Sequence, residues 1–149
     1  MSVTLTLAQP DDLDRTERLV AACHEAVGIP SDEEARRDAL APLLEGTPHG
    51  ALYLIGPPKS PVGYAALTFG WSVEYAGVIA RVDEIFIRHG VRGRGMGTEA
   101  LSRLAPVLTR HGIRAVEIDI DPADERLRRL YARIGFRPRR RPGTLVRRP

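Results

Sequence analysis

The most constraining stretch of the chain lies at residues 82–101. A run of strand-forming residues ends at Ile87, alternating glycines follow, and apolar residues with helical spacing begin at Leu101. The stretch therefore predicts a strand, a glycine-rich turn and the start of a helix. Unpaired N–H groups at a helix N-terminus attract anions, and glycines let the backbone approach a phosphate closely. We expect a phosphate-binding loop here.

Length and composition predict one globular domain covering residues 1–149. The hydrophobic fraction is 43%, the charged fraction is 28% and the formal net charge is +3, as in soluble proteins. No apolar run approaches the roughly 18 to 20 residues of a membrane-spanning helix. Residues 1–10 lack the features of a secretory signal, so a cytoplasmic protein without a membrane partner is expected. Cys23 is the only cysteine, which excludes an internal disulfide, and its apolar helical position predicts a core thiol.

The first half of the chain predicts two strands separated by two helices. Strands are expected at 3–7 and 51–56, and the first helix at about 11–27. Ser31 and Glu34 form a capping-box pattern that opens the second helix. That helix should extend to about residue 45, with Pro42 kinking or shortening it.

The second half predicts a long antiparallel pair, in which an alternating strand from 65 to 73 turns at 74–77 and returns at 78–87. A helix at 97–111, interrupted by Pro106, should then lead to a strand at 116–120 that runs parallel to the returning strand. A last helix is expected at 124–134. The Arg- and Pro-rich tail at 136–149 has room for one or two short edge strands.

Two motifs on these elements resemble those of the GNAT superfamily of acetyl-CoA-dependent N-acetyltransferases. The first is the R-x-x-G-x-G pattern from Arg92 to Gly97, and the second is the Leu-Tyr-x-x-x-Gly-Phe pattern ending at Phe136. The resemblance implies an α/β (α+β) fold with a mixed, mostly antiparallel sheet of six to seven strands and helices on both faces. The rival dinucleotide fingerprint is disfavoured, because its glycine spacing differs and too little chain follows for a doubly wound sheet.

The resemblance implies a coenzyme A site without a metal. Its loop residues would hold the pyrophosphate through backbone N–H groups, and the preceding strand would pair with the pantetheine arm. A backbone donor near Ile87 would stabilise the developing oxyanion. Asp124 stands where many relatives have an Asn that contacts the coenzyme. The expected coenzyme-binding residues are Ile85, Phe86, Ile87, Arg92, Gly93, Arg94, Gly95, Met96, Gly97, Thr98 and Asp124.

The expected catalytic residues are Tyr131, Asp83 and Glu84. Tyr131 occupies the position of the family's general acid. Asp83 and Glu84 should project to opposite faces of one strand, and a carboxylate among apolar neighbours tends to titrate high, which suits a base or an ammonium ligand. The resemblance to polyamine acetyltransferases favours Asp83, whereas simple pairing with an Arg such as Arg81 is the alternative for either carboxylate.

The resemblance implies transfer of acetyl to a primary amine of a small molecule or peptide, by direct attack in a ternary complex. Trp71, Glu74 and Tyr75 at the end of the long hairpin are expected to line the acceptor site, with core packing as the alternative for Trp71. A non-catalytic acyl-CoA sensor is the alternative function. A nucleic-acid-binding module built on the basic tail is less favoured, because no aromatic residues interleave its arginines. A homodimer is left open.

Overall fold

The computed structural model describes residues 3–93, 95–139 and 143–149, so Arg94 lies outside the described residues. The chain divides into two compact units, Met1–Asp119 and Ile120–Pro149, which are described separately. The single domain expected from chain length therefore stays a prediction.

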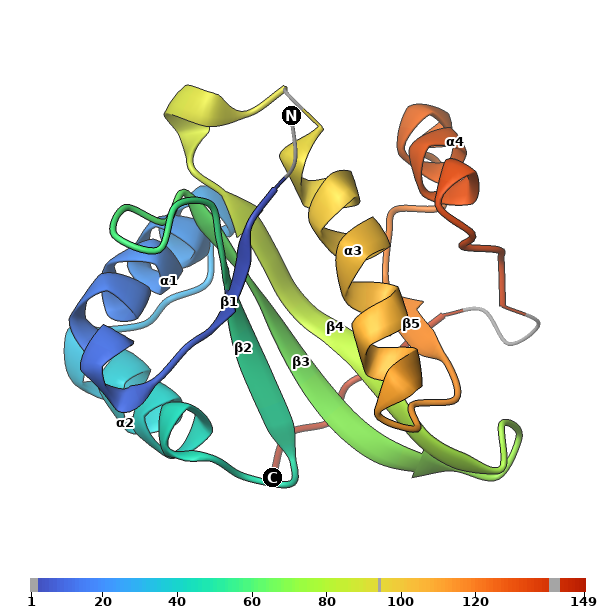
Figure 1. Cartoon of the computed structure of the whole chain (residues 1–149), viewed down its shortest axis with the longest axis horizontal. Helices are drawn as coiled ribbons and strands as arrows, with labels where there is room; N and C mark the ends of the chain where they lie inside the picture. The colour runs from blue at the N-terminus through green and yellow to red at the C-terminus, as the bar shows by residue number, and fades with distance from the viewer. Residues whose placement is uncertain (1–2, 94, 140–142) are drawn as a thin grey trace. The chain divides into compact units, whose positions relative to one another are not determined.

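The first unit is built around a mostly antiparallel sheet (Figure 1). Its described strands have the order β1-β2-β3-β4-β5, and only the β4–β5 pair is parallel. In chain order the elements are β1 (Leu5–Leu7), η1 (Pro10–Asp12), α1 (Leu13–Val27), α2 (Glu33–Glu45), β2 (Gly50–Ile55), β3 (Gly63–Ser72), β4 (Gly77–Ile87), η2 (His89–Val91), α3 (Met96–Arg110) and β5 (Val116–Ile118).

The mixed sheet is confirmed, but the expected six to seven strands are wrong, because the described residues form a sheet of five. The described part of the tail, residues 136–139 and 143–149, forms no strand. Proline lacks the N–H that a strand ladder needs, and Pro138 and Pro149 both fall in this part. Leu145 and Val146 are exposed, so the tail has no buried face to fix a register.

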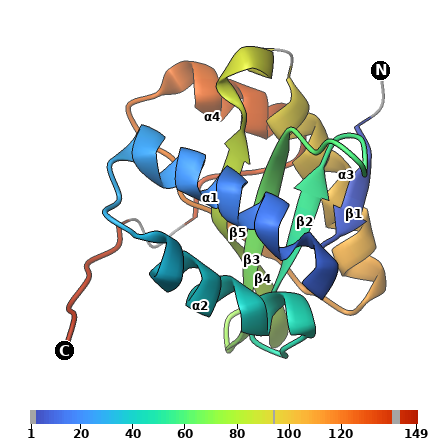
Figure 2. The same ribbon diagram turned by 90° about the vertical axis from the view of Figure 1, so that its left-hand side faces the viewer.

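Helices cover both faces of this sheet, as expected, with α1 and α2 on one face and α3 on the other (Figure 2). The amphipathic pattern of each helix explains its place, because its buried residues share one stripe. The core on the α1 and α2 face consists of Ala8, Leu19, Val20, Cys23, Leu40, Leu44, Leu52, Leu54, Tyr64, Ala66 and Phe86. On α3 the buried residues are Ala100, Leu101, Leu104 and Leu108. Cys23 is a buried free thiol, as expected.

The expected interruption of the 97–111 helix by Pro106 is wrong, and so is a shortening of the second helix at Pro42, because each helix continues through its proline. A kink of α2 at Pro42 stays a prediction. A proline removes one backbone hydrogen bond, and the buried apolar stripe of α3 compensates for that loss. The second helix is capped by Asp32 rather than by Ser31: Oδ1 of Asp32 accepts a hydrogen bond of 2.8 Å from the Ala35 N–H.

An irregularity in β4 changes its register with β3. Ala66 pairs with Glu84 and Leu67 pairs with Val82, which leaves Asp83 as the extra residue of a β-bulge. On its other side β4 pairs with β5 only as far as Val82, opposite Ile118. The last five residues of β4 therefore extend past the end of the described β4–β5 pairing.

The second unit contains α4 (Glu125–Arg133). Asp124 is its N-cap, and Oδ1 of Asp124 accepts a hydrogen bond of 2.9 Å from the Leu127 N–H. The helix ends before Gly135, which has a φ of 100°. The expected helix at 124–134 and its glycine stop are thus confirmed. In the described part of the chain, no helix is both long and apolar enough to cross a membrane.

The close approach of β3 to β4 predicts a specific cost for a side chain at Gly63. A Cβ added there would lie 2.1 Å from the Phe86 carbonyl oxygen, so the strands would have to separate. Gly63→Ala should destabilise the protein by about 2 kcal/mol or more in urea unfolding. Gly70→Ala on the same strand is the control, because a Cβ there meets nothing within 4 Å. Equal stability of the two variants would contradict the described pairing.

Candidate active site

The end of β4 presents backbone groups on its side away from β3. The Arg88 N–H donates to the Val62 carbonyl at 2.7 Å, so the backbone N–H of Arg88 points toward β3. Since these directions alternate along a strand, the N–H groups of Ile85 and Ile87 point the other way. The Ile87 carbonyl follows this pattern, because it accepts a bond from an Arg92 side chain outside the sheet. These two N–H groups lie beyond the last residue pair of β4 with β5.

The glycine-rich turn connects this edge to the N-terminus of α3. Gly93 and Gly95 have φ angles of 82° and 71°, in the left-handed region that favours glycine. Gly95 is the N-cap of α3. The N–H groups of the first turn have no partner within the helix and point out of its N-terminal end. Gly97 lies close to β4, because a Cβ there would be 3.8 Å from Cδ1 of Ile85. Such N–H groups suit an anion, and phosphate binding by this loop stays a prediction.

Two side chains of the loop have internal partners. Nε of Arg92 donates to the Ile87 carbonyl at 2.8 Å, and its guanidinium lies 5.1 Å from the centre of the Phe86 ring. Arg92 therefore binds the turn to the end of β4. The hydroxyl of Thr98 donates to the Gly95 carbonyl at 3.1 Å. Phosphate contacts by Arg92 and Thr98 stay predictions.

Asp83 is exposed at the bulge, where the β4–β5 pairing ends. The pKa of its carboxyl is raised, first because the surrounding protein displaces water from it and second by the negative charge of Glu84. Arg81 and His24 oppose that shift. The bulge breaks the strict alternation on which the expectation of opposite faces for Asp83 and Glu84 rests.

Glu84 is half-buried and both of its carboxylate oxygens have partners. The Tyr64 hydroxyl donates to Oε1 at 2.7 Å, and Nε2 of His24 lies 2.8 Å from Oε2. Sequence reasoning missed both partners. His24 follows the buried Val20 by one helical turn, and Tyr64 lies within the long strand. A polar side chain at a core-facing position needs a hydrogen-bond partner, and this was the sequence pattern that could have indicated a partner for Glu84.

The described ion pairs of Arg81 are with one acidic residue of β5 and one that directly follows β5, rather than with the two acidic residues of β4. NH1 of Arg81 lies 3.9 Å from Glu117, and NH2 of Arg81 pairs with Asp119. Arg81 affects Asp83 through its charge alone in this arrangement. The simple structural pairing of Asp83 or Glu84 with Arg81 is therefore disfavoured.

The other two expected site residues of the C-terminal region belong to the second unit. Tyr131 is buried and its ring packs edge-on against Phe136, with 5.6 Å between the ring centres. Burial raises the pKa of the Tyr131 hydroxyl, which keeps its proton in place at neutral pH. Asp124 accepts the cap hydrogen bond of α4. Their roles in acid catalysis and coenzyme binding stay predictions.

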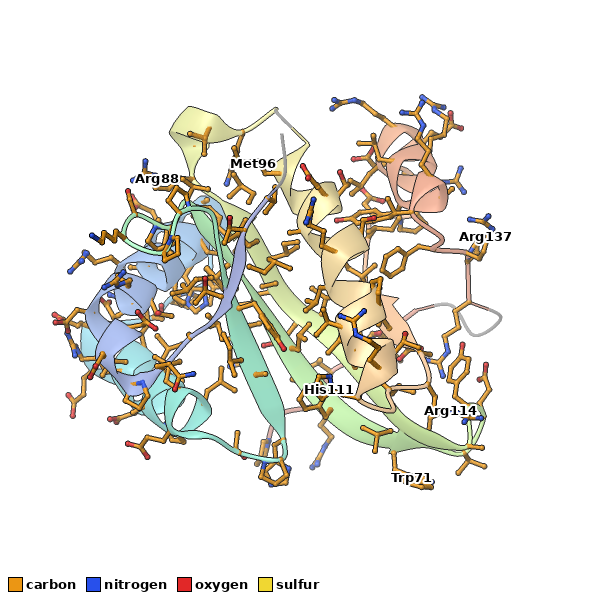
Figure 3. All side chains as sticks on the ribbon, in the orientation of Figure 1. Trp71, Arg88, Met96, His111, Arg114 and Arg137 are labelled. Atoms are coloured by element: carbon orange, nitrogen blue, oxygen red, sulfur yellow. The ribbon has the colours of Figure 1, made fainter. Side chains whose placement is uncertain are left out.

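Trp71, Glu74 and Tyr75 lie at the turn end of the β3–β4 hairpin. Figure 3 shows Trp71 at the opposite end of this hairpin from Arg88 and Met96, which flank the glycine-rich turn. The alternative of core packing for Trp71 is wrong, because Trp71 is 75% exposed. The structure does not bring these residues together with Asp83 and Glu84, and their contact with an acceptor stays a prediction.

The family of the chain is established by comparison with known proteins. The family model of the Acetyltransferase (GNAT) family matches residues 13–136, and the chain belongs to this family. This confirms the resemblance inferred from the two motifs. Enzymes of the family use acetyl-CoA, and membership supports an acyltransferase.

Individual relatives agree with this assignment. An uncharacterized N-acetyltransferase of Methanocaldococcus jannaschii is 32% identical over 78 residues, which are 51% of this chain and 34% of that protein. An integron cassette protein, HFX_CASS3, from the Cole Harbour Salt Marsh metagenome has a TM-score of 0.80 at 28% identity, covering 97% and 91% of the two chains. An acetyltransferase candidate of Arthrobacter sp. FB24 has a TM-score of 0.76 at 29% identity, covering 90% and 85%.

The raised pKa of Asp83 predicts a pH-dependent effect on stability. Since the folded state disfavours the ionised form, the charged Asp83 destabilises the fold above its folded pKa, and protonation removes that effect. Asp83→Asn should therefore have a higher urea midpoint than the parent protein at pH 7. The difference should vanish below about pH 4, the ordinary carboxyl pKa, where Asp83 is neutral in both states. A less stable variant at pH 7 would show that the carboxylate makes a stabilising contact.

Proposed function

We propose that the protein is an N-acetyltransferase that moves the acetyl group of acetyl-CoA to a primary amine of a small molecule or peptide. The amine would attack directly in a ternary complex. The observation that carries this proposal is the end of β4, where outward N–H groups lie beyond the β5 pairing and lead straight into an N-terminal anion site. Few arrangements bind an extended arm and a phosphate in sequence along one edge.

The chain's residues fit acetyl-CoA along this edge. The first-turn N–H groups of α3, together with Gly93 and Gly95, suit the pyrophosphate. The backbone of Ile85 and Ile87 suits the amide groups of the pantetheine arm, as an added strand suits a sheet edge. When bound, acetyl-CoA supplies a thioester whose carbonyl accepts the attack. An outward N–H of β4 would stabilise the negative charge that develops on that carbonyl oxygen.

Asp83 and Glu84 would bind and deprotonate the acceptor amine. An ammonium group must lose a proton before its nitrogen can attack, so a base is required. We assign that role to Asp83, because its carboxyl has a raised pKa and an exposed position at the bulge. Glu84, whose two oxygens are each held by one hydrogen bond, would orient the ammonium through its negative charge.

Tyr131 would complete the reaction as the acid that protonates the departing thiolate. A hydroxyl with a raised pKa is protonated at neutral pH and can donate. Asp124 would contact the coenzyme with the carboxylate lone pairs that remain beside its cap hydrogen bond.

Calorimetric titration with acetyl-CoA tests the proposed site. Gly95→Ala disfavours the left-handed conformation of this residue by about 1–2 kcal/mol, so the free loop should relax out of it and coenzyme binding should have to restore it. The acetyl-CoA affinity of the variant should therefore fall, by up to roughly five- to thirtyfold. Gly90→Ala is the matched control, because this nearby glycine has an ordinary φ and open space around it. If the parent protein does not bind acetyl-CoA at high concentration, the proposal is contradicted.

A thiol-release assay over amines, amino acids and peptide N-termini tests catalysis. Tyr131→Phe removes the donor and preserves the ring that packs on Phe136, so turnover should fall by roughly a hundredfold while acetyl-CoA affinity is preserved. Unchanged turnover in this variant would remove Tyr131 from the acid role. Binding of acetyl-CoA without thiol release for every acceptor would favour the sensor function.

A further inference from the structure

A chain of hydrogen bonds leads from Glu84 on β4 to the connection between α1 and α2. Nε2 of His24 lies 2.8 Å from Oε2 of Glu84, and Nδ1 of His24 lies 2.7 Å from Oγ of Ser31. Arg36 on α2 completes the chain, since its NH1 donates to Oγ of Ser31 at 3.2 Å and to the Ser31 carbonyl at 2.6 Å. Nε of Arg36 donates to the buried Glu17 at 2.7 Å.

One direction in this chain follows from the chemistry of its groups. A carboxylate can only accept, so Nε2 of His24 donates to Oε2 of Glu84 while the Tyr64 hydroxyl donates to Oε1. A guanidinium can only donate, so the Ser31 oxygen accepts from Arg36. In the hydrogen bond between Oγ of Ser31 and Nδ1 of His24, either group can be the donor.

The surroundings keep this arrangement partly out of water. The side chains of His24 and Glu84 are 14% and 23% exposed, and Tyr64 is fully buried. Cys23 on α1 and Tyr64 belong to the same buried core. The charged or titratable groups near Glu84 and His24 are Asp83, Tyr64, Cys23, Arg36, Glu17 and Arg92. Hydrogen bonds to a carboxylate are stronger here than at an open surface.

We propose that His24 is a positioning residue that holds the Glu84 carboxylate for the acceptor amine and couples it, through Ser31 and Arg36, to the α1–α2 connection. This inference rests on the proposed N-acetyltransferase function. Glu84 held by two donors has one orientation and retains lone pairs for an ammonium group. Without His24, only the Tyr64 bond would fix the carboxylate, and the ammonium would meet a mixture of orientations.

Substitutions of His24 separate hydrogen bonding from packing. His24→Leu removes the donor, whereas His24→Gln supplies an amide N–H that can reach Glu84. We expect kcat/KM for the acceptor to fall by roughly ten- to hundredfold in His24→Leu and to recover in large part in His24→Gln. The KM for acetyl-CoA should not change in either variant. His111→Leu is the control, because His111 is exposed and its ring, among the described residues, bonds the Val107 carbonyl of its own helix.

Nitrogen NMR of the His24 ring tests the chain without any assay of activity. The parent protein should show a proton on Nε2 of His24, because the facing carboxylate oxygen can only accept. At pH 7 the carboxyl carbon signal of Glu84 should shift in His24→Leu, because one donor to that carboxylate is lost. In His24→Gln it should return close to its position in the parent protein, because the amide N–H restores a donor.

The outcomes distinguish this inference from the proposed function. A parent protein that neither binds acetyl-CoA nor releases thiol contradicts the function, and the carboxyl carbon signal of Glu84 in the His24 variants then decides whether His24 holds the carboxylate. An active parent protein with unimpaired His24→Leu overturns the positioning role alone. A His24 ring without a proton on Nε2, or a His24→Gln variant as defective as His24→Leu, also overturns it.

Discussion

The structure depends on a single constraint, the change of register at Asp83 in β4. The extra residue there lets β4 remain paired with β3 along its whole length while its pairing with β5 stops at Val82. A bulge bends a strand and redirects its side chains and backbone groups. The redirected groups are the ones on which the candidate site relies, namely the outward N–H groups of Ile85 and Ile87 and the two acidic side chains.

Packing on both faces holds this irregular strand in place. Phe86 belongs to the core shared with α1 and α2, while the side chains of Ile85 and Ile87 lie near Gly97 at the start of α3. Apolar burial thus fixes the side chains and leaves the outward backbone groups for recognition. The same packing places the start of α3 beside the end of β4.

Much of the fold could be predicted from the sequence, because long periodic segments carry their own signal. The alternation in β3 and β4, the glycine turn and the buried stripe of α3 are examples. The bulge could not be predicted, since a prediction from strand periodicity assumes that each residue of one strand pairs with one residue of its neighbour. His24 and Tyr64 were missed because their link to Glu84 spans 60 and 20 residues of sequence. The strands expected in the tail are not found among its described residues. Proline cannot donate to the hydrogen bonds of a sheet, and the apolar residues of the tail are exposed rather than buried against the core.

Backbone hydrogen exchange along β4 tests the account most directly. When acetyl-CoA is added, the amides of Ile85 and Ile87 should become strongly protected, because they point away from β3 toward the proposed pantetheine arm. The amides of Glu84 and Phe86, which face β3, should exchange as slowly before addition as after it. Equal protection of all four amides, or no change at Ile85 and Ile87 at saturating acetyl-CoA, would contradict the claim that the edge beyond the bulge binds the coenzyme.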